Sequence, residues 1–143
     1  MGGKITVSVR WQGKVLPGVT TKLRQVAQAT LARIGVKEGG LSVLLCDDRT
    51  IELLNRHFRG KPAPTDVLSF PAHDPTPSGG LHLGDIAISV ETAARQAETA
   101  GHPLARELCL LLIHGTLHVC GFDHETDHGE MAALEAELRE ELL

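Results

Sequence analysis

Residues 103–124 read PLARELCLLLIHGTLHVCGFDH and contain a long apolar run bounded by a proline and a glycine. Pro103 suits the first turn of a helix, and Gly121 suits the position just after a helix end. Between them the chain is mostly apolar, which is typical of a helix that is buried against a sheet. We therefore predict a long buried helix from Pro103 to about Cys120.

The segments on either side of this helix predict further strands and helices. Period-2 alternation or short apolar runs predict strands, and apolar residues at spacings of three and four predict helices. The expected strands cover 5–11, 41–46, 66–70 and 83–90, and the expected helices cover 19–34, 51–58, 92–100, 103–120 and 131–143. Pro71–Gly80 is rich in turn-forming residues and is expected to be a mobile connection. The predicted fold class is α+β, an α/β-type layer in which a small mixed sheet of about four strands is covered by about five helices.

Length and composition describe one ordinary globular domain. The chain has 143 residues, of which 42% are hydrophobic and 22% charged, so we expect a single domain over 1–143. Its apolar runs fall far short of the ~20 residues that span a bilayer, and its first residues lack the apolar core of a signal peptide. Three cysteines at no metal-like spacing suit reduced thiols. We expect a cytoplasmic protein with no membrane partner.

Charge is divided unevenly along the chain. Residues 1–60 hold ten Lys and Arg against four Asp and Glu, whereas residues 61–143 hold four against fourteen. The basic first part can present a face to nucleic acid, although solvated helix faces explain the same distribution. The chain has one Trp, three Phe and no Tyr, so RNA would be held by charge and shape more than by stacking.

Four histidines fall close together in the last third of the chain. His114 and His118 are four positions apart on the predicted helix, so their side chains lie one turn apart on the same face. Gly121 ends the helix, and a reversal after it can return His124 to that face. Three imidazoles with a position left open for water are typical of a catalytic zinc site. We predict that these three histidines bind a metal ion, whereas His128 belongs to a polar loop and is expected at the surface.

The same spacing occurs in the His-Glu-x-x-His-x-x-Gly-x-x-His motif of metzincin proteases. Gly115 stands where those enzymes carry their general-base glutamate, and glycine cannot accept a proton. A metalloprotease would have to take its base from elsewhere in the chain. Peptide hydrolysis is therefore the second hypothesis.

Three blocks of sequence resemble one known family. The string His114–His124, HGTLHVCGFDH, closely resembles the signature of the bacterial YbeY proteins, which are metal-dependent endoribonucleases of rRNA maturation. Leu54–Lys61 (LNRHFRGK) followed by Pro64–Pro71 (PTDVLSFP) resembles the central block of that family, and Leu83–Ser89 (LGDIAIS) resembles a third block. The blocks occur in the family's order and span about half of the chain.

The resemblance implies a single-strand-specific, metal-dependent endoribonuclease that acts in ribosomal RNA processing. It implies one zinc ion per chain, or nickel or another transition metal, held by His114, His118 and His124. Arg59 would hold the phosphate group, whose oxygens gain negative charge as the phosphodiester is cleaved. Attack would come from metal-activated water or from the 2′-OH of the RNA.

The task that the resemblance implies is maturation of the 3′ end of small-subunit rRNA, together with ribosome quality control. The implied partners are ribosomal RNA and the ribosome or its small subunit, with ribosomal proteins and assembly GTPases as further candidates. A third hypothesis is a ribosome-assembly factor without catalysis, whose metal is structural and whose basic first part holds RNA. Phe58 and Phe122 stand where family members often have Tyr, so any role of a hydroxyl group is absent there.

Three carboxylates near these blocks are candidates for supporting roles. Asp123 precedes a predicted ligand and either orients an imidazole by accepting its hydrogen bond or caps the loop. Asp85, in the middle of a strand, is expected to be a structural hydrogen-bonding group, with a base near the metal as the alternative. Asp66 is expected to fix its turn. The sequence identifies no general base.

Overall fold

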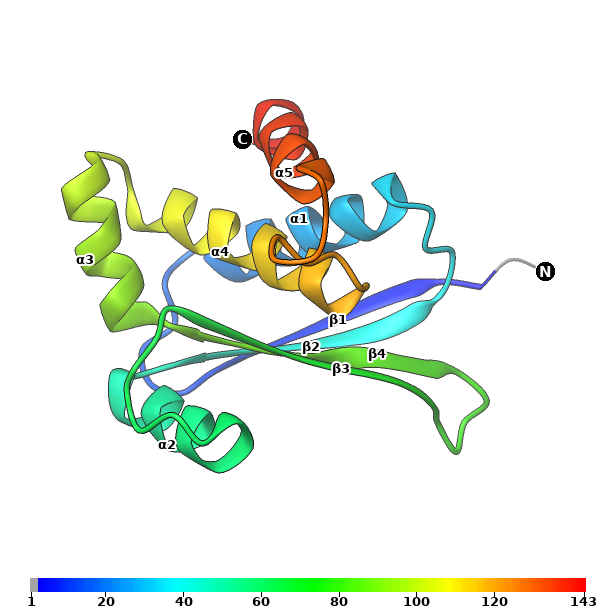
Figure 1. Cartoon of the computed structure of the whole chain (residues 1–143), viewed down its shortest axis with the longest axis horizontal. Helices are drawn as coiled ribbons and strands as arrows, with labels where there is room; N and C mark the ends of the chain where they lie inside the picture. The colour runs from blue at the N-terminus through cyan, green and yellow to red at the C-terminus, as the bar shows by residue number, and fades with distance from the viewer. Residues whose placement is uncertain (1–2) are drawn as a thin grey trace.

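The computed structural model describes residues 3–143, and within them four strands form one sheet. The strands are β1 (Ile5–Trp11), β2 (Gly39–Cys46), β3 (Val67–Pro75) and β4 (Leu81–Ser89). β1, β2 and β4 run parallel in that spatial order, and β3 pairs antiparallel with β4 at the edge (Figure 1). The predicted mixed sheet is thus confirmed, and the structure supplies the strand order.

The hairpin of β3 and β4 is longer than predicted. The sequence predicts a connection over Pro71–Gly80, but the first half of this segment continues β3 as far as Pro75. Pairing with β4 resumes after a register shift, and His73 has a left-handed φ of 55° within this irregularity. This irregularity lets β3 continue past Pro71, although proline often ends a strand. The turn itself covers only residues 76–80, and within it the Oγ1 of Thr76 accepts a hydrogen bond from the N–H of Gly80 at 3.0 Å.

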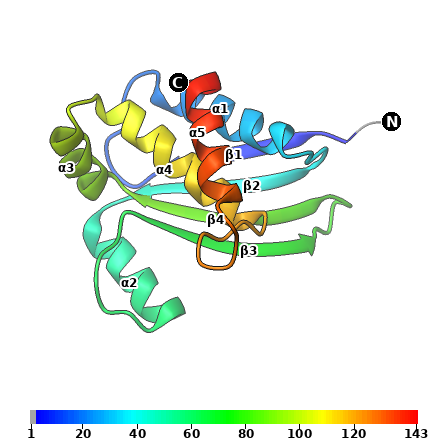
Figure 2. The same ribbon diagram turned by 45° about the horizontal axis from the view of Figure 1, so that its top comes forward.

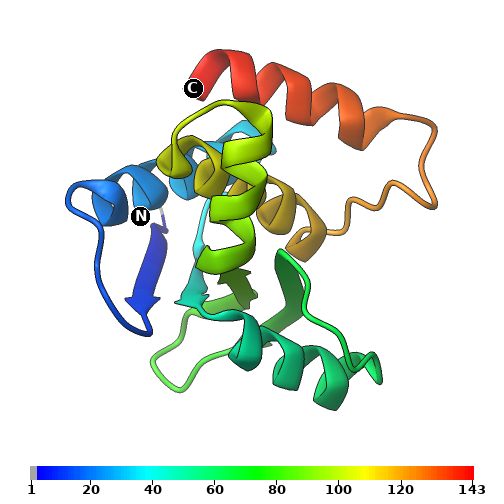
Figure 3. The same cartoon turned by 90° about the vertical axis from the view of Figure 1, so that its left-hand side faces the viewer.

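Five helices within the described residues connect and cover the sheet. They are α1 (Val19–Arg33), α2 (Asp48–Arg59), α3 (Val90–Ala100), α4 (Leu104–Val119) and α5 (Glu130–Leu142). α1 and α4 pack together on one face of the sheet, and α5 lies over them (Figures 1 and 3). α2 lies against the opposite face. All the predicted helices are present, with ends that differ by a few residues.

Helix ends coincide with capping residues that the sequence supplies. The carboxylate of Asp47 caps α2 by accepting a hydrogen bond from the N–H of Thr50 at 2.8 Å. Gly101 follows α3 with a φ of 73°, and Gly121 follows the end of α4 with a φ of 97°. Glycine adopts these left-handed values without strain. The turn at Gly121 therefore reverses the chain just after the helix that carries His114 and His118.

The apolar helix α4 is buried, as predicted. It packs against β3, β4, α1 and α3, and its Leu108, Leu112 and Leu117 are fully buried. Burial of a side chain of this size contributes roughly 1.5–3 kcal/mol. This packing fixes the position of the α4 backbone from which the remaining surface side chains extend. None of the helices described over 3–143 is long and apolar enough to cross a membrane.

Candidate metal centre

The remaining surface of α4 carries the two helical histidines. His114 and His118 are half-buried, with ring centroids 4.6 Å apart. Their Nε2 atoms are 3.1 Å apart. Two nitrogen ligands of one tetrahedral zinc ion lie about 3.3 Å apart, because Zn–N bonds measure about 2.0–2.1 Å. The pair therefore presents two imidazole nitrogens at a spacing that suits one ion.

The loop after α4 brings the third histidine to this pair. The His124 ring stacks on the His114 ring, with centroids 5.5 Å apart and an interplanar angle of 18°. This loop follows directly on the end of α4 (Figure 2), and at that end His73 of β3 hydrogen-bonds the carbonyl oxygen of Val119 at 2.9 Å. His114 thus neighbours both His118 and His124, whereas the group of donor atoms that all lie within 4.8 Å of one another contains His114 and His124 but not His118. Metal binding by the three histidines stays a prediction. His128, predicted at the surface, is exposed.

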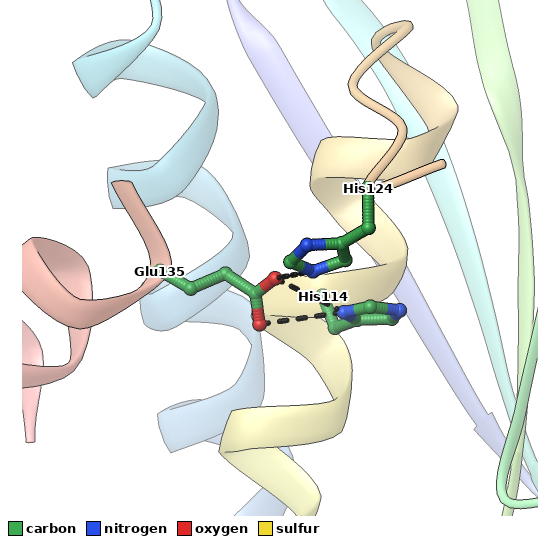
Figure 4. Close-up of side chains that lie close together, drawn as sticks. All are labelled: His114, His124 and Glu135. Carbon is green, nitrogen blue, oxygen red and sulfur yellow. Dashed lines mark hydrogen bonds and ion pairs between the residues drawn. The ribbon is translucent and has the colours of Figure 1, made fainter. Parts of the chain in front are cut away.

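Glu135 of α5 joins this cluster and is missing from the sequence prediction. Its carboxylate accepts hydrogen bonds from Nδ1 of His114 (3.2 and 3.3 Å) and from Nε2 of His124 (2.7 Å), as Figure 4 shows. These three residues offer donor atoms that all lie within 4.8 Å of one another. The signal in the sequence is positional. Glu135 lies four residues after Met131 and three before Leu138, so it shares their inward face.

The side chains of the cluster differ in their affinity for protons. The hydrogen bond with Glu135 raises the pKa of His114 above its usual value, against the opposing effect of burial. Burial lowers the pKa of His118, and the charge of the neighbouring His114 lowers it further. Burial acts to raise the pKa of Glu135, but its hydrogen bonds and ion pairs with His114 and His124 outweigh burial and lower it. The cluster therefore combines an ionised carboxylate with an imidazole, His118, that favours its neutral, metal-binding form.

Gly115 follows His114 directly but faces the sheet. A Cβ atom at this position would lie 3.0 Å from Cγ2 of Ile86 and 3.2 Å from Oγ of Ser69. Ser69 also donates a hydrogen bond to the carbonyl oxygen of Gly115 at 3.1 Å. The glycine thus allows α4 to approach the sheet closely, and a glutamate side chain has no room there. This packing is a physical reason for the missing base of the protease hypothesis.

The carboxylates predicted to have supporting roles have structural partners. Asp123 accepts a hydrogen bond from the backbone N–H two residues later at 2.9 Å, which caps the loop. Its alternative role, as acceptor for an imidazole, stays a prediction. Asp66 accepts a hydrogen bond from the next backbone N–H at 2.7 Å, as predicted for a turn. Asp85 accepts one from Nε2 of His82 at 3.0 Å.

Arg59 lies at the C-terminal end of α2, on the sheet face opposite α4 (Figure 1). It lines a cavity of about 840 Å³, and Arg10 of β1 lines the same cavity. Phe58 and Phe70 also line it, with ring centroids 5.1 Å apart. The edge strand β3 borders this cavity and also contacts α4 through Ser69. The edge of the sheet therefore separates Arg59 from the histidines, a placement that the sequence does not indicate.

The protein is thus a small α+β protein with a group of His and Glu side chains, beside its buried helix, that could hold a metal ion. Residues 10–143 match the family model described as Endoribonuclease YbeY. The chain therefore belongs to the YbeY family. The resemblance drawn from the three sequence blocks is confirmed.

Individual relatives extend this comparison. The chain is 50% identical over 119 residues to Endoribonuclease YbeY of Anaeromyxobacter sp. (strain Fw109-5), which covers 82% of this chain and 62% of the relative. It is 42% identical over 138 residues to Endoribonuclease YbeY of Geobacter sulfurreducens, covering 94% of this chain and 91% of the relative. The solution structure of TM1509 from Thermotoga maritima is similar, with a TM-score of 0.62 and 27% identity, covering 95% of this chain and 88% of that one. The chain thus spans about three fifths of the length of the Anaeromyxobacter relatives.

Proposed function

We propose that this protein is a metal-dependent endoribonuclease that acts on single-stranded ribosomal RNA. Membership in a family whose relatives are named endoribonucleases supports the reaction class. The observation that carries the proposal is the gathering of His114, His118 and His124 beside one buried helix. Imidazoles held this close together suit a shared ion better than a packed protein interior.

The donor set of the cluster fits a transition-metal ion. Imidazole nitrogens and carboxylate oxygens are the ligands of catalytic zinc, and nickel and copper also accept imidazole. We propose that His114, His118 and His124 hold one zinc ion per chain, with nickel or another transition metal as the alternative. Such an ion supplies Lewis acidity toward a phosphoryl oxygen and lowers the pKa of water.

Arg59 is proposed to hold the phosphate of the substrate, since its planar guanidinium can donate two hydrogen bonds to phosphate oxygens. The cavity that it shares with Arg10 is bordered by the edge strand β3. A single RNA strand that passes around this edge would meet both arginines on one face and the histidines on the other. Single-strand specificity rests on the resemblance of the sequence blocks to the YbeY family.

The proposed substrate is the 3′ region of small-subunit rRNA, and ribosome quality control is the wider task. The ribosome or its small subunit is the proposed partner in the cytoplasm, with ribosomal proteins and assembly GTPases as candidate contacts. Names of relatives support RNA cleavage. The ribosomal substrate and partners rest on the resemblance of the sequence blocks to the YbeY family.

The two rival hypotheses are not favoured. Gly115 faces Ile86 and Ser69, so the metalloprotease hypothesis lacks a general base at the expected position. A structural zinc ion is normally enclosed by four protein ligands. The side chain of His124 is 41% exposed, so the cluster is open to solvent on that side.

Cleavage of an end-labelled small-subunit rRNA 3′ fragment tests the proposal. We expect the wild type to cleave the fragment, to lose activity with a chelator and to regain it with zinc. His114→Ala is expected to be inactive, and His128→Ala, an exposed histidine of the same region, is the control that stays active. A 2′-deoxy nucleotide at the cleavage site blocks the reaction if the 2′-OH attacks and permits it if water attacks.

Two outcomes contradict the proposed function. Equal cleavage by wild type and His114→Ala would mean that the activity belongs to another site or to a contaminant. No cleavage by the wild type, either of free RNA or of RNA on small ribosomal subunits, would favour the assembly-factor hypothesis.

A further inference from the structure

Glu135 is the acidic residue of α5 that faces inward. Met131 and Leu138, one turn to each side of it, are fully buried and fix this face of α5. The Glu135 side chain is only 18% exposed. The other acidic residues of the helix are exposed, namely Glu130, Glu137, Glu140 and Glu141. A carboxylate in this position is costly unless it is hydrogen-bonded, and its partners are the imidazoles of His114 and His124.

The contact with His114 determines which ring nitrogen of that histidine is free. An ionised carboxylate only accepts hydrogen bonds, so Nδ1 of His114 carries the proton that points to Glu135. In the neutral ring, Nε2 then has the lone pair. This is the atom that lies 3.1 Å from Nε2 of His118. The carboxylate thus turns the metal-binding nitrogen of His114 toward the second helical imidazole.

We propose that Glu135 is the positioning residue of the metal site. By accepting the Nδ1–H bond of His114, it fixes the orientation and the tautomer of that ring, so that Nε2 is free to bind the ion. Its second hydrogen bond comes from Nε2 of His124, so by the same rule Nδ1 is the free nitrogen of that ring, and one carboxylate orients both rings. This inference rests on the proposed metal site. Outer carboxylate partners of this kind typically contribute 10–100-fold in metal affinity.

Two other roles for Glu135 lead to different expectations. As a direct ligand it would bind the ion together with His114 and His124, the group whose donor atoms lie within 4.8 Å, and His118 would be dispensable. As a purely structural residue it would only hold α5 against α4. Its loss would then lower stability and leave metal affinity unchanged.

Zinc affinity of the full chain, measured by competition with a chromophoric chelator, separates these roles. We expect Glu135→Ala to weaken zinc binding by about 10–100-fold. Glu135→Gln is expected to weaken it less, because the amide oxygen still accepts the bond from His114. Glu140→Gln makes the same charge change on the exposed side of α5 and is expected to bind zinc as the wild type does. His118→Ala is expected to lose more affinity than Glu135→Ala, and the reverse order would mean that Glu135 is a direct ligand.

The tautomer of His114 in the metal-free protein is a second readout. Imidazole nitrogen-15 shifts are expected to show Nδ1–H in the wild type and in Glu135→Gln, and a mixture of tautomers in Glu135→Ala. Wild-type zinc affinity in Glu135→Ala, or an unchanged tautomer, would overturn this inference and leave the proposed function intact. A wild type that binds no zinc would overturn both.

Discussion

Two imidazoles one helical turn apart respond in opposite ways to their surroundings. Glu135 raises the pKa of His114, whereas burial and the neighbouring imidazole lower the pKa of His118. At the scale of single residues, this difference comes from one carboxylate that the histidine spacing does not reveal. The carboxylate of Glu135 hydrogen-bonds the His114 ring, whereas the carboxylates of Asp123 and Glu135 act on the His118 ring only through their charge.

The pairing of Glu135 with His114 makes the stability of the metal-free protein depend on pH. Because folding raises the pKa of His114, its contribution is fully present below the unfolded pKa of 6.5 and is lost as the pH rises through the folded value. Because folding lowers the pKa of Glu135, its contribution is present above the unfolded pKa of 4.5 and is lost as the pH falls through the folded value. The pair of Glu135 and His114 therefore contributes most to the stability of the folded protein between pH 4.5 and pH 6.5.

We expect the difference in Tm between wild type and Glu135→Gln, measured with chelator present, to be greatest between pH 4.5 and 6.5. The difference should shrink as the pH rises further, and circular dichroism melts across this range measure it. Glu140→Gln, on the exposed side of the same helix, should show no such trend. A difference in Tm between wild type and Glu135→Gln that increases toward alkaline pH would contradict the pairing of Glu135 with His114.

At the scale of elements, α4 reaches the sheet through glycines on both sides of the contact. Gly115 supplies the helix side, and Gly84 of β4 supplies the sheet side. A Cβ at Gly84 would lie 2.6 Å from the carbonyl oxygen of Phe70 and 3.0 Å from Cγ1 of Val119. β3, β4 and the end of α4 therefore meet at one point, which leaves no room for a side chain and places the end of α4 relative to the edge strand.

Gly84→Ala is expected to destabilise the protein by about 1–3 kcal/mol, the usual cost of overpacking. The effect should exceed that of Gly115→Ala, because the new methyl group meets the backbone of β3 instead of side chains that can move. Gly80→Ala is the control, since its Cβ would meet only Oγ1 of Thr76 at an ordinary 3.4 Å. Urea unfolding measures all three. If Gly84→Ala unfolded at the same urea concentration as the wild type, the close contact of Gly84 with Phe70 and Val119 would be loose in solution.

At the scale of the whole molecule, the sheet separates a cavity with two arginines from the histidine cluster. Arg10 and Arg59 both come from the basic first part of the chain, and Glu135 comes from the acidic second part. The two arginines thus place positive charge on one face of the sheet, and Glu135 lies with the histidines on the other. Such an arrangement can hold an RNA backbone on one face while cleavage takes place near the other.

We expect Arg59→Ala to keep wild-type zinc affinity and to lose most RNA cleavage. Because each phosphate contact releases counterions, RNA binding by the wild type should weaken with salt, and the variant should lower the slope of log K against log salt by about 1. Arg56→Ala is the matched control, since Arg56 pairs with Glu52 at 3.6 Å on the same helix. Filter binding and cleavage assays measure both effects. Full activity in Arg59→Ala would mark Arg59 as a solvated surface residue.

Features that depend on neighbours along the chain could be predicted from the residues alone. The helices, their caps at Asp47 and Gly101, and the turn at Gly121 follow from residues within a few positions of one another. The i, i+4 spacing of His114 and His118 and the order of the three blocks are also local, and they were enough to identify the family.

Features that depend on distant segments became visible only once the chain was folded. The strand order, the extension of β3 to Pro75 and the face of the sheet that carries Arg59 arise from pairing and packing between separate elements. Glu135 meets His114 across 21 positions because the burial of Met131 and Leu138 turns that side of α5 inward. A period in the sequence indicates which side of a helix is buried, but the partner on that side is selected by packing with the rest of the chain.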